Sequence, residues 1–206
     1  MYVVTADQVG SRTDVDRSAA MREHLQERYG DRLRLPVDQT AGDELQLLTA
    51  DAETATDVIL DLARDGHWSI GLGVGEVREP LPDAVRMATG DAFFAAREAV
   101  DAAKRADARF ALRAPAATSA PVPPEEVESL ARLLLLLRQR RTTQGWEAVD
   151  LVAGGRSQKD AAQRLGISDA AVSQRLRTAM WTADEEARPA IIRLVAGLDG
   201  GAADDG

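Results

Sequence analysis

A proline-rich segment divides the chain into two parts with different patterns. Four prolines fall among small residues within residues 113–126, and this composition disfavours both helix and strand. Before it, short apolar runs alternate with helical patterns, whereas every pattern after it is helical. The sequence therefore predicts an α+β domain at residues 1–114, a linker at 115–124, an all-α domain at 125–198 and a flexible tail at 199–206.

The order of elements before the linker predicts one sheet with helices on one face. Apolar runs bounded by turns read as strands at residues 2–6, 32–39, 44–49, 68–77 and 109–113. Helical patterns cover residues 14–30, 51–65 and 90–105. The βαββαβ order of the first six elements predicts a ferredoxin-like or palm-like sandwich. Glycines 71, 73 and 75 mark a strand that another backbone approaches closely, or one that is bulged or crowded.

The composition excludes several classes of site. With no cysteine and only two histidines, disulfides and thiolate metal sites are impossible, and a histidine-based zinc site is not expected. The longest apolar run, Leu133–Leu137, is far shorter than the ~20 residues that span a bilayer. It is expected in the core, with a dimer-forming helix as the alternative. No signal-peptide pattern opens the chain, so a cytoplasmic protein without membrane contact is predicted.

Charge is distributed unevenly along the chain. The formal net charge of −9 argues against non-specific nucleic-acid binding by the whole protein. Residues 1–115 carry 14 Lys and Arg against 21 Asp and Glu, a net −7, whereas residues 138–181 carry 8 against 4, a net +4. A basic segment inside an acidic protein is compatible with a local DNA-binding surface.

Residues 157–180 carry the most specific local pattern. Ser157 is placed to cap a helix, and Asp160 makes an acidic variant of the capping box. Gly166 supplies a left-handed turn residue, and Ser168 can cap the next helix. Apolar residues fall where two such helices pack together, at Ala161, Leu165, Ile167, Val172 and Leu176. This pattern is typical of a DNA-binding helix-turn-helix; a structural helical hairpin is the alternative.

The second helix of this motif would enter the major groove. Gln174 can read adenine through two hydrogen bonds, whereas Arg175 and Arg177 are expected on phosphates. The predicted DNA-contacting residues are Ser168, Asp169, Ala170, Ser173, Gln174, Arg175 and Arg177. The segment resembles the helical modules of LuxR-type regulators and sigma-factor region 4. Because one module contacts only a few base pairs, a homodimer is expected if binding is specific.

Carboxylates at two strand ends predict a metal site in the first domain. Asp7 ends the first strand, and Asp43 follows the turn at Gly42, so the predicted sheet places them side by side. Two carboxylates within ~4 Å repel by about 4 kcal/mol at an effective dielectric of ~20, and a divalent cation removes that cost. Gly10 and Ser11 are expected to open the first helix, whose N–H groups could hold a triphosphate.

Four segments of this domain resemble known families. TADQVGS (5–11), TAGDELQLL (40–48), IGLGVGEV (70–77) and FFAAREAV (93–100) are similar to successive motifs of class III nucleotidyl cyclases. The SatD family is a closer match, because D-x-V-G-S, G-D-E-x-Q, G-x-G-x-G-E and G-D-A-F-x-x-A-R-E-A occur in that order in its members. Some of these members also end in a helix-turn-helix, so the resemblance covers nearly the whole chain.

The resemblance implies a nucleotide site with Mg²⁺ or Mn²⁺. Asp7 and Asp43 match the cyclase metal carboxylates, Gly42 and Glu44 belong to the hairpin motif, and Arg97 matches the arginine that binds phosphate. Two departures weaken catalysis. Phe93 stands where cyclases have an asparagine, and Gln39 or Thr40 replaces the lysine that reads adenine.

Each of these residues also has a simpler role open to it. Asp7 and Asp43 can serve their turns alone, Glu44 can be a solvated strand residue, and Arg97 can be a salt-bridged surface residue.

We predict a DNA-binding transcriptional regulator whose degenerate cyclase-like domain senses or binds a nucleotide or a divalent metal. A Mg²⁺-dependent nucleotidyl-transfer enzyme and a non-catalytic interaction scaffold are the alternatives.

Overall fold

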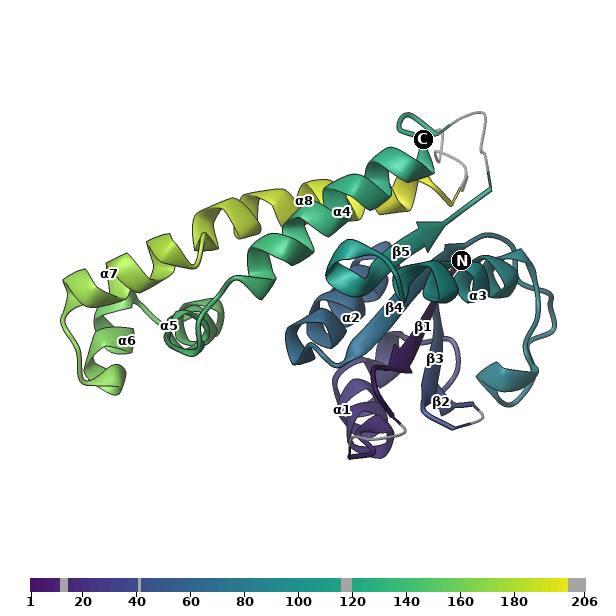
Figure 1. Ribbon diagram of the computed structural model, residues 1–206, viewed down its shortest axis with the longest axis horizontal. Coiled ribbons are helices and arrows are strands. Elements are labelled where there is room, and N and C mark those ends of the chain that lie inside the picture. The colour runs from purple at the N-terminus through teal and green to yellow at the C-terminus, as the bar shows by residue number, and fades with distance from the viewer. Residues whose placement is uncertain (12–14, 41, 116–119, 200–206) are drawn as a thin grey trace.

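One five-stranded mixed sheet organises the protein. The computed structural model describes residues 1–11, 15–40, 42–115 and 120–199 (Figure 1). The sheet order is β2-β3-β1-β4-β5, and only the β4–β5 pair is parallel. The strands are β1 (Tyr2–Gln8), β2 (Asp38–Gln39), β3 (Glu44–Thr49), β4 (Trp68–Val74) and β5 (Phe110–Arg113). The predicted hairpin arm at 32–39 forms a strand only at its last two residues, although the N–H of Arg34 also donates to the carbonyl of Leu48 at 2.9 Å.

Helices cover both faces of this sheet, so the prediction of helices on one face is wrong. Along β1, Tyr2 and Val4 join a core with α1 (Ser18–Tyr29) and α2 (Ala52–Asp65). Val3 instead points to the opposite face, where it packs with α3 (Asp91–Ala103). Successive side chains of a strand alternate between faces, and β1 is apolar on both, so both faces need a cover.

Glycines allow α3 to lie directly on the sheet. A Cβ at Gly71 would lie 2.3 Å from the backbone nitrogen of Val100, and one at Gly73 would lie 2.1 Å from the carbonyl oxygen of Ala92. No side chain larger than hydrogen can occupy these positions without moving the helix. The close backbone approach predicted from the glycine spacing is confirmed.

The first and last helices after the linker pack into the core of the sheet region. Val127 and Leu134 of α4 (Pro124–Gln139) and Ile191 of α8 (Trp181–Gly197) belong to the same cluster as the sheet and α2. The predicted division at 115–124 therefore does not separate α4 and α8 from the core of the sheet region. Residues 116–119 and 200–206 lie outside the described residues. Helix α8, which no local sequence pattern singled out, completes the cover of this face.

Side chains of α4 also close one edge of the sheet. Leu112 of β5 donates its backbone N–H to Glu128 at 2.6 Å, and the Nε of Arg132 donates to the carbonyl of Phe110 at 2.8 Å. An edge strand otherwise presents unpaired backbone groups to other chains. Glu128 and Arg132 thus bind the outward backbone groups of β5 and fix α4 against it.

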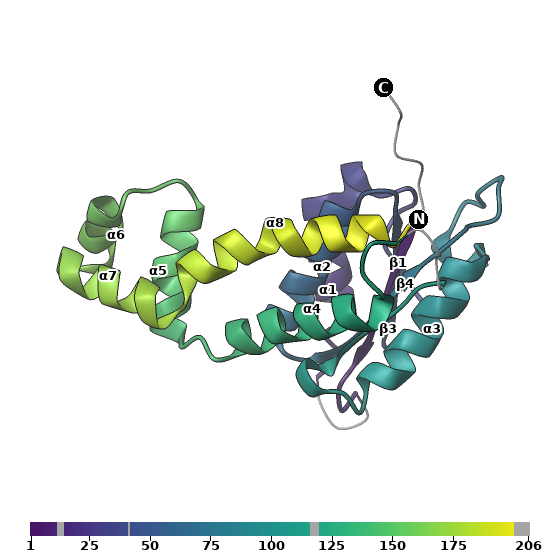
Figure 2. The same cartoon turned by 90° about the horizontal axis from the view of Figure 1, so that it is seen from above.

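Three short helices form a separate tip, defined here as residues 143–178. Helices α5 (Thr143–Ala153), α6 (Gln158–Leu165) and α7 (Asp169–Thr178) enclose a small cluster of their own, and α4 and α8 carry them away from the sheet (Figure 2). Within the described part of the chain, no helix combines the length and apolar character needed to cross a membrane.

Candidate functional site

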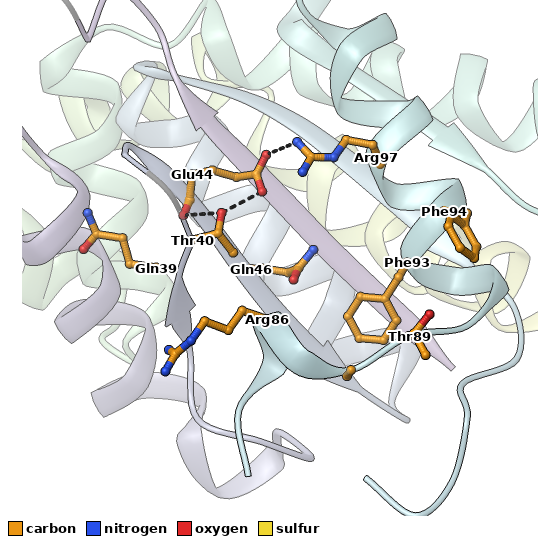
Figure 3. Close-up of a pocket in the computed structure, with 10 residues that line it drawn as sticks. Gln39, Thr40, Glu44, Gln46, Arg86, Thr89, Phe93, Phe94 and Arg97 are labelled. Carbon is orange, nitrogen blue, oxygen red and sulfur yellow. Dashed lines mark hydrogen bonds and ion pairs between the residues drawn. The ribbon is translucent and has the colours of Figure 1, made fainter. Parts of the chain in front are cut away.

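A cleft of about 680 Å³ opens where α3 leaves β3 uncovered (Figure 3). This volume lies within the range of small-molecule sites. Its walls combine two arginines, one carboxylate, neutral hydrogen-bonding side chains and aromatic rings. The lining residues are Gln39, Thr40, Glu44, Gln46, Arg86, Ala88, Thr89, Phe93, Phe94 and Arg97.

Glu44 is the carboxylate that faces the cleft. Its Cα pairs with that of Asp7 across β1 and β3, so both side chains point to the face that α3 covers. One Glu44 oxygen accepts from Arg97 at 2.8 Å, and the other accepts from the Thr40 hydroxyl at 2.8 Å. Glu44 is buried, and these two donors compensate part of the cost of burying its charge.

Arg86 provides the second cation of the cleft. Its guanidinium and its backbone N–H both reach Asp38, at 2.8 Å and 3.1 Å. Arg86 lies in a 3₁₀ turn at Val85–Met87 for which no sequence pattern predicted a role. Each cleft arginine therefore already has a carboxylate partner, and an anionic ligand would have to compete with Asp38 and Glu44.

Asp7 and Asp43, the predicted metal ligands, have different surroundings. Asp7 forms an ion pair with Lys104 at 2.8 Å, and hydrogen bonds to Asp7 and then to Asp101 raise the pKa of the Lys104 ammonium. Among the described residues that line the cleft, Asp43 is absent.

The acidic side chains of the described residues do not form a ready-made metal cluster. Across the described residues, no three His, Cys, Asp or Glu side chains group closely enough to hold a metal ion. Glu44 is a single carboxylate, and two donors already share it. Mg²⁺ takes most of its six ligands from carboxylates, water and phosphate, so a Mg²⁺ ion at Glu44 would need its other ligands from water and phosphate.

The expectation that Gly10 and Ser11 open the first helix is wrong. Helix α1 begins at Ser18, so neither residue lies at its first turn. The buried side chain of Gln8 closes the intervening loop, because it donates to the carbonyl of Val15 at 2.7 Å and accepts from the N–H of Arg17 at 2.9 Å. Residues 12–14 lie outside the described residues.

The hairpin glycine has a local role. Gly42 takes a positive φ of 86°, and its carbonyl accepts from the Gln39 side chain at 2.8 Å. A positive φ favours glycine, so Gly42 shapes the turn that presents Thr40 and Glu44. Phe93, one helical turn before Arg97, lines the cleft with its ring turned toward Thr89 (Figure 3).

The tip carries the local features that the sequence predicted. Ser157 and Asp160 form the reciprocal capping box, and Gly166 adopts the left-handed conformation at φ 66°. Ser168 caps α7 by accepting from the N–H of Ala171. Five of the predicted DNA-contacting residues are exposed, namely Ser168, Asp169, Ala170, Gln174 and Arg177, while Ser173 and Arg175 are half-buried.

Arg175 differs from the other predicted contacts. It pairs with Glu147 of α5 at 3.1 Å, with only 27% of its side chain exposed. This ion pair fastens α7 to α5, so Arg175 is better placed to position the helix than to hold a phosphate.

Four cations of the tip form no ion pair with any residue that the structure describes. No ion pair among the described residues involves Arg156, Lys159, Arg164 or Arg177, and all four side chains are exposed. The positive net charge of residues 138–181 predicted a basic surface. Only the structure distinguishes these four exposed cations from the arginines that form ion pairs within the protein.

Comparison with protein-family models, curated proteins and solved structures finds no match for this chain.

Proposed function

We propose that the protein is a DNA-binding regulator in which α6, the turn at Gly166 and α7 form a helix-turn-helix. The observation that carries the proposal is the exposed start of α7, capped by Ser168, in a tip with four exposed cations that form no ion pair within the described residues. Free cations release condensed counterions when they meet phosphates, and this release supplies much of the affinity of proteins for DNA. An internally paired structural hairpin has no such cations to offer.

The binding experiment uses the full chain and a labelled pool of random duplexes, followed by fluorescence anisotropy from ~50 to ~200 mM salt. We expect binding that weakens steeply with salt, because several phosphates are neutralised. Selection of bound sequences should then give a consensus that contains an adenine read by Gln174. Gln174→Ala should reduce the preference for this adenine by about 1–3 kcal/mol. Absence of binding at the lowest salt would contradict the proposal.

We further propose that the sheet region has the ferredoxin-like, palm-like arrangement of the SatD family. The antiparallel order β2-β3-β1-β4, with α1 between β1 and β2 and α2 between β3 and β4, supports this interpretation. The glycines under α3 and the order of the four motifs support it as well.

In this proposal the cleft binds a small phosphorylated ligand such as a nucleotide. Arg86 and Arg97 provide the cationic walls, and Thr40, Gln46 and Thr89 provide neutral hydrogen-bonding groups. Because the donor set favours an anion over a resident cation, we propose binding through arginine and not through a Mg²⁺ held by Asp7 and Asp43. Nucleotidyl transfer is correspondingly the less favoured alternative.

A thermal-shift screen of nucleotides, with and without Mn²⁺, tests the cleft. A ligand at a hundredfold excess over its Kd stabilises the protein by about 2.7 kcal/mol. We expect stabilisation that does not require Mn²⁺ and that Arg97→Gln abolishes. Arg105→Gln, at an exposed arginine just after α3 that does not line the cleft, serves as a control. Stabilisation that needs Mn²⁺ and is lost in Asp7→Ala would instead favour the metal site.

A further inference from the structure

Helix α4 exposes a second apolar stripe. Its buried face, with Val127, Leu134 and Leu135, packs in the core. On the other side Leu130, Leu133 and Leu136 are 45%, 64% and 38% exposed, and the half-buried Leu137 continues the stripe. Spacings of three and four residues place these leucines on one helical face.

The ends of this stripe carry opposite charges. Glu126 lies seven residues before Leu133 and Arg140 lies seven residues after it, which is two helical turns in each direction. Both side chains are exposed. Within the described residues, no ion pair involves either of them.

This arrangement is complementary to itself. When a second copy of α4 lies antiparallel across the first, with Leu133 facing Leu133, Leu130 of each copy faces Leu136 of the other. Glu126 of each copy then faces Arg140 of the other, so both ends of the contact carry opposite charges. A two-fold contact requires one surface to match itself in this way.

We propose that a second copy of this chain docks on the exposed stripe of α4, in an antiparallel contact centred on Leu133. One helical face buries little area, so the interface is expected at the small end of specific contacts, below about 1,200 Å². The dissociation constant should accordingly lie in the micromolar range.

The contact would place the two tips at opposite ends of the dimer. Each α4 has 16 residues and is about 24 Å long, and its C-terminal end leads to the tip (Figure 1). The C-terminal ends of the two α4 helices would thus lie about 24 Å apart, with each tip beyond its own end. Any match between this arrangement and the spacing of DNA half-sites rests on the proposed DNA binding, whereas the dimer itself does not.

The experiment is sedimentation equilibrium of the full chain without DNA, over a range that extends to roughly 300 µM. We expect a reversible dimer in the wild type. Leu133→Glu should raise the dissociation constant about 30-fold or more, because it buries two like charges at the centre of the contact. Met87→Glu, at another apolar residue that is 57% exposed, is the matched control and should leave the dimer unchanged.

A charge exchange separates this contact from any other apolar association. Glu126→Arg and Arg140→Glu should each weaken the dimer about fivefold, since each places like charges at both ends. The double variant should restore wild-type association. Circular dichroism verifies that each variant is folded, which the exposure of these residues favours.

A wild type that stays monomeric to the highest concentration would overturn the proposal. So would a dimer that Leu133→Glu leaves intact, or a double charge exchange that associates no better than its single variants.

Discussion

The cleft and the tip both contain arginines and lysines, but these cations differ in whether they are free to bind an anionic ligand. In the cleft region Arg97, Arg86 and Lys104 are each held by a carboxylate, at 2.8 Å in every case. In the tip, Lys159 and Arg177 have no acidic partner among the described residues. Composition alone does not distinguish these cases. A polyanion can bind the tip at once, whereas an anionic ligand in the cleft must displace an existing ion pair.

The joint between the two regions depends on a buried carboxylate. Asp184 of α8 accepts from Arg138, in the last turn of α4, and from Arg141, just after that helix, both at 2.7 Å. The side chains of Arg141 and Asp184 are only 1% and 2% exposed. Arg141 also lies over the ring of Trp146, 4.7 Å from its centroid.

Removing this carboxylate should have the largest effect on stability. Asp184→Ala leaves two guanidinium groups buried without their partner, and we expect a loss of about 3–5 kcal/mol in the free energy of unfolding, measured in urea. The adjacent exposed Glu186 gives the control, because Glu186→Ala should change stability by less than about 0.5 kcal/mol. A loss below about 1 kcal/mol in Asp184→Ala would mean that the joint does not hold the regions together.

A methyl group under α3 should damage the sheet region next. In Gly73→Ala the new Cβ collides with backbone of α3 at 2.1 Å, and we expect a cost of about 3 kcal/mol. The matched substitution in the tip is Gly145→Ala, where the nearest atom lies at 3.4 Å. There a gain of about 0.5–1 kcal/mol is expected, since alanine favours the helix interior. Equal effects at the two sites would refute close packing of α3 on β4.

Helix caps provide a smaller contrast, and pH distinguishes them. Asp51 caps α2 by accepting from the N–H groups of Glu53 and Thr54. Burial alone would raise the pKa of Asp51, but hydrogen bonds from Thr54 and Glu53 lower this pKa below its usual value. The cap therefore stabilises the fold fully above the unfolded-state pKa, about 3.9, and loses this effect as pH falls through the lowered folded-state value.

Asp51→Ala should accordingly cost about 1–2 kcal/mol at pH 7 and progressively less toward pH 3, measured by thermal unfolding. Ser168→Ala in the tip should cost about 1 kcal/mol, detected as faster hydrogen exchange in α7. Because the Ser168 hydroxyl does not titrate and caps α7 through the N–H of Ala171, its effect should be the same at both pH values. A pH-independent effect of Asp51→Ala would contradict the assigned cap.

Local patterns predicted more of this molecule than long-range ones did. The caps at Ser157 and Ser168 and the turn at Gly166 are confirmed, because each depends on residues within one turn of helix. The glycines of β4 also predicted that another backbone segment approaches this strand closely, but they did not indicate which helix it is.

The cleft was harder to predict, because the register between two strands depends on both strands and cannot be read from either segment alone. The pairing of Asp7 with Glu44 makes Glu44, not Asp43, the residue that faces the cleft. Arg86 and Lys104 come from segments without a recognisable motif, and only the folded chain brings them to Asp38 and Asp7. Helices α2, α4 and α8 share one core. The proline-rich linker predicted a domain boundary and gave no sign of this shared core.

The most direct test of the central claim compares the loss of three cations from each region. One variant replaces Lys159, Arg164 and Arg177 by glutamine, and the other replaces Arg86, Arg97 and Lys104, so that both change the net charge equally. Duplex affinity is measured for each as a function of salt. The account predicts that the tip variant loses about 2–3 units of slope in log K against log salt, while the cleft variant keeps the wild-type slope. Equal losses in the two variants, or a larger loss in the cleft variant, would contradict it.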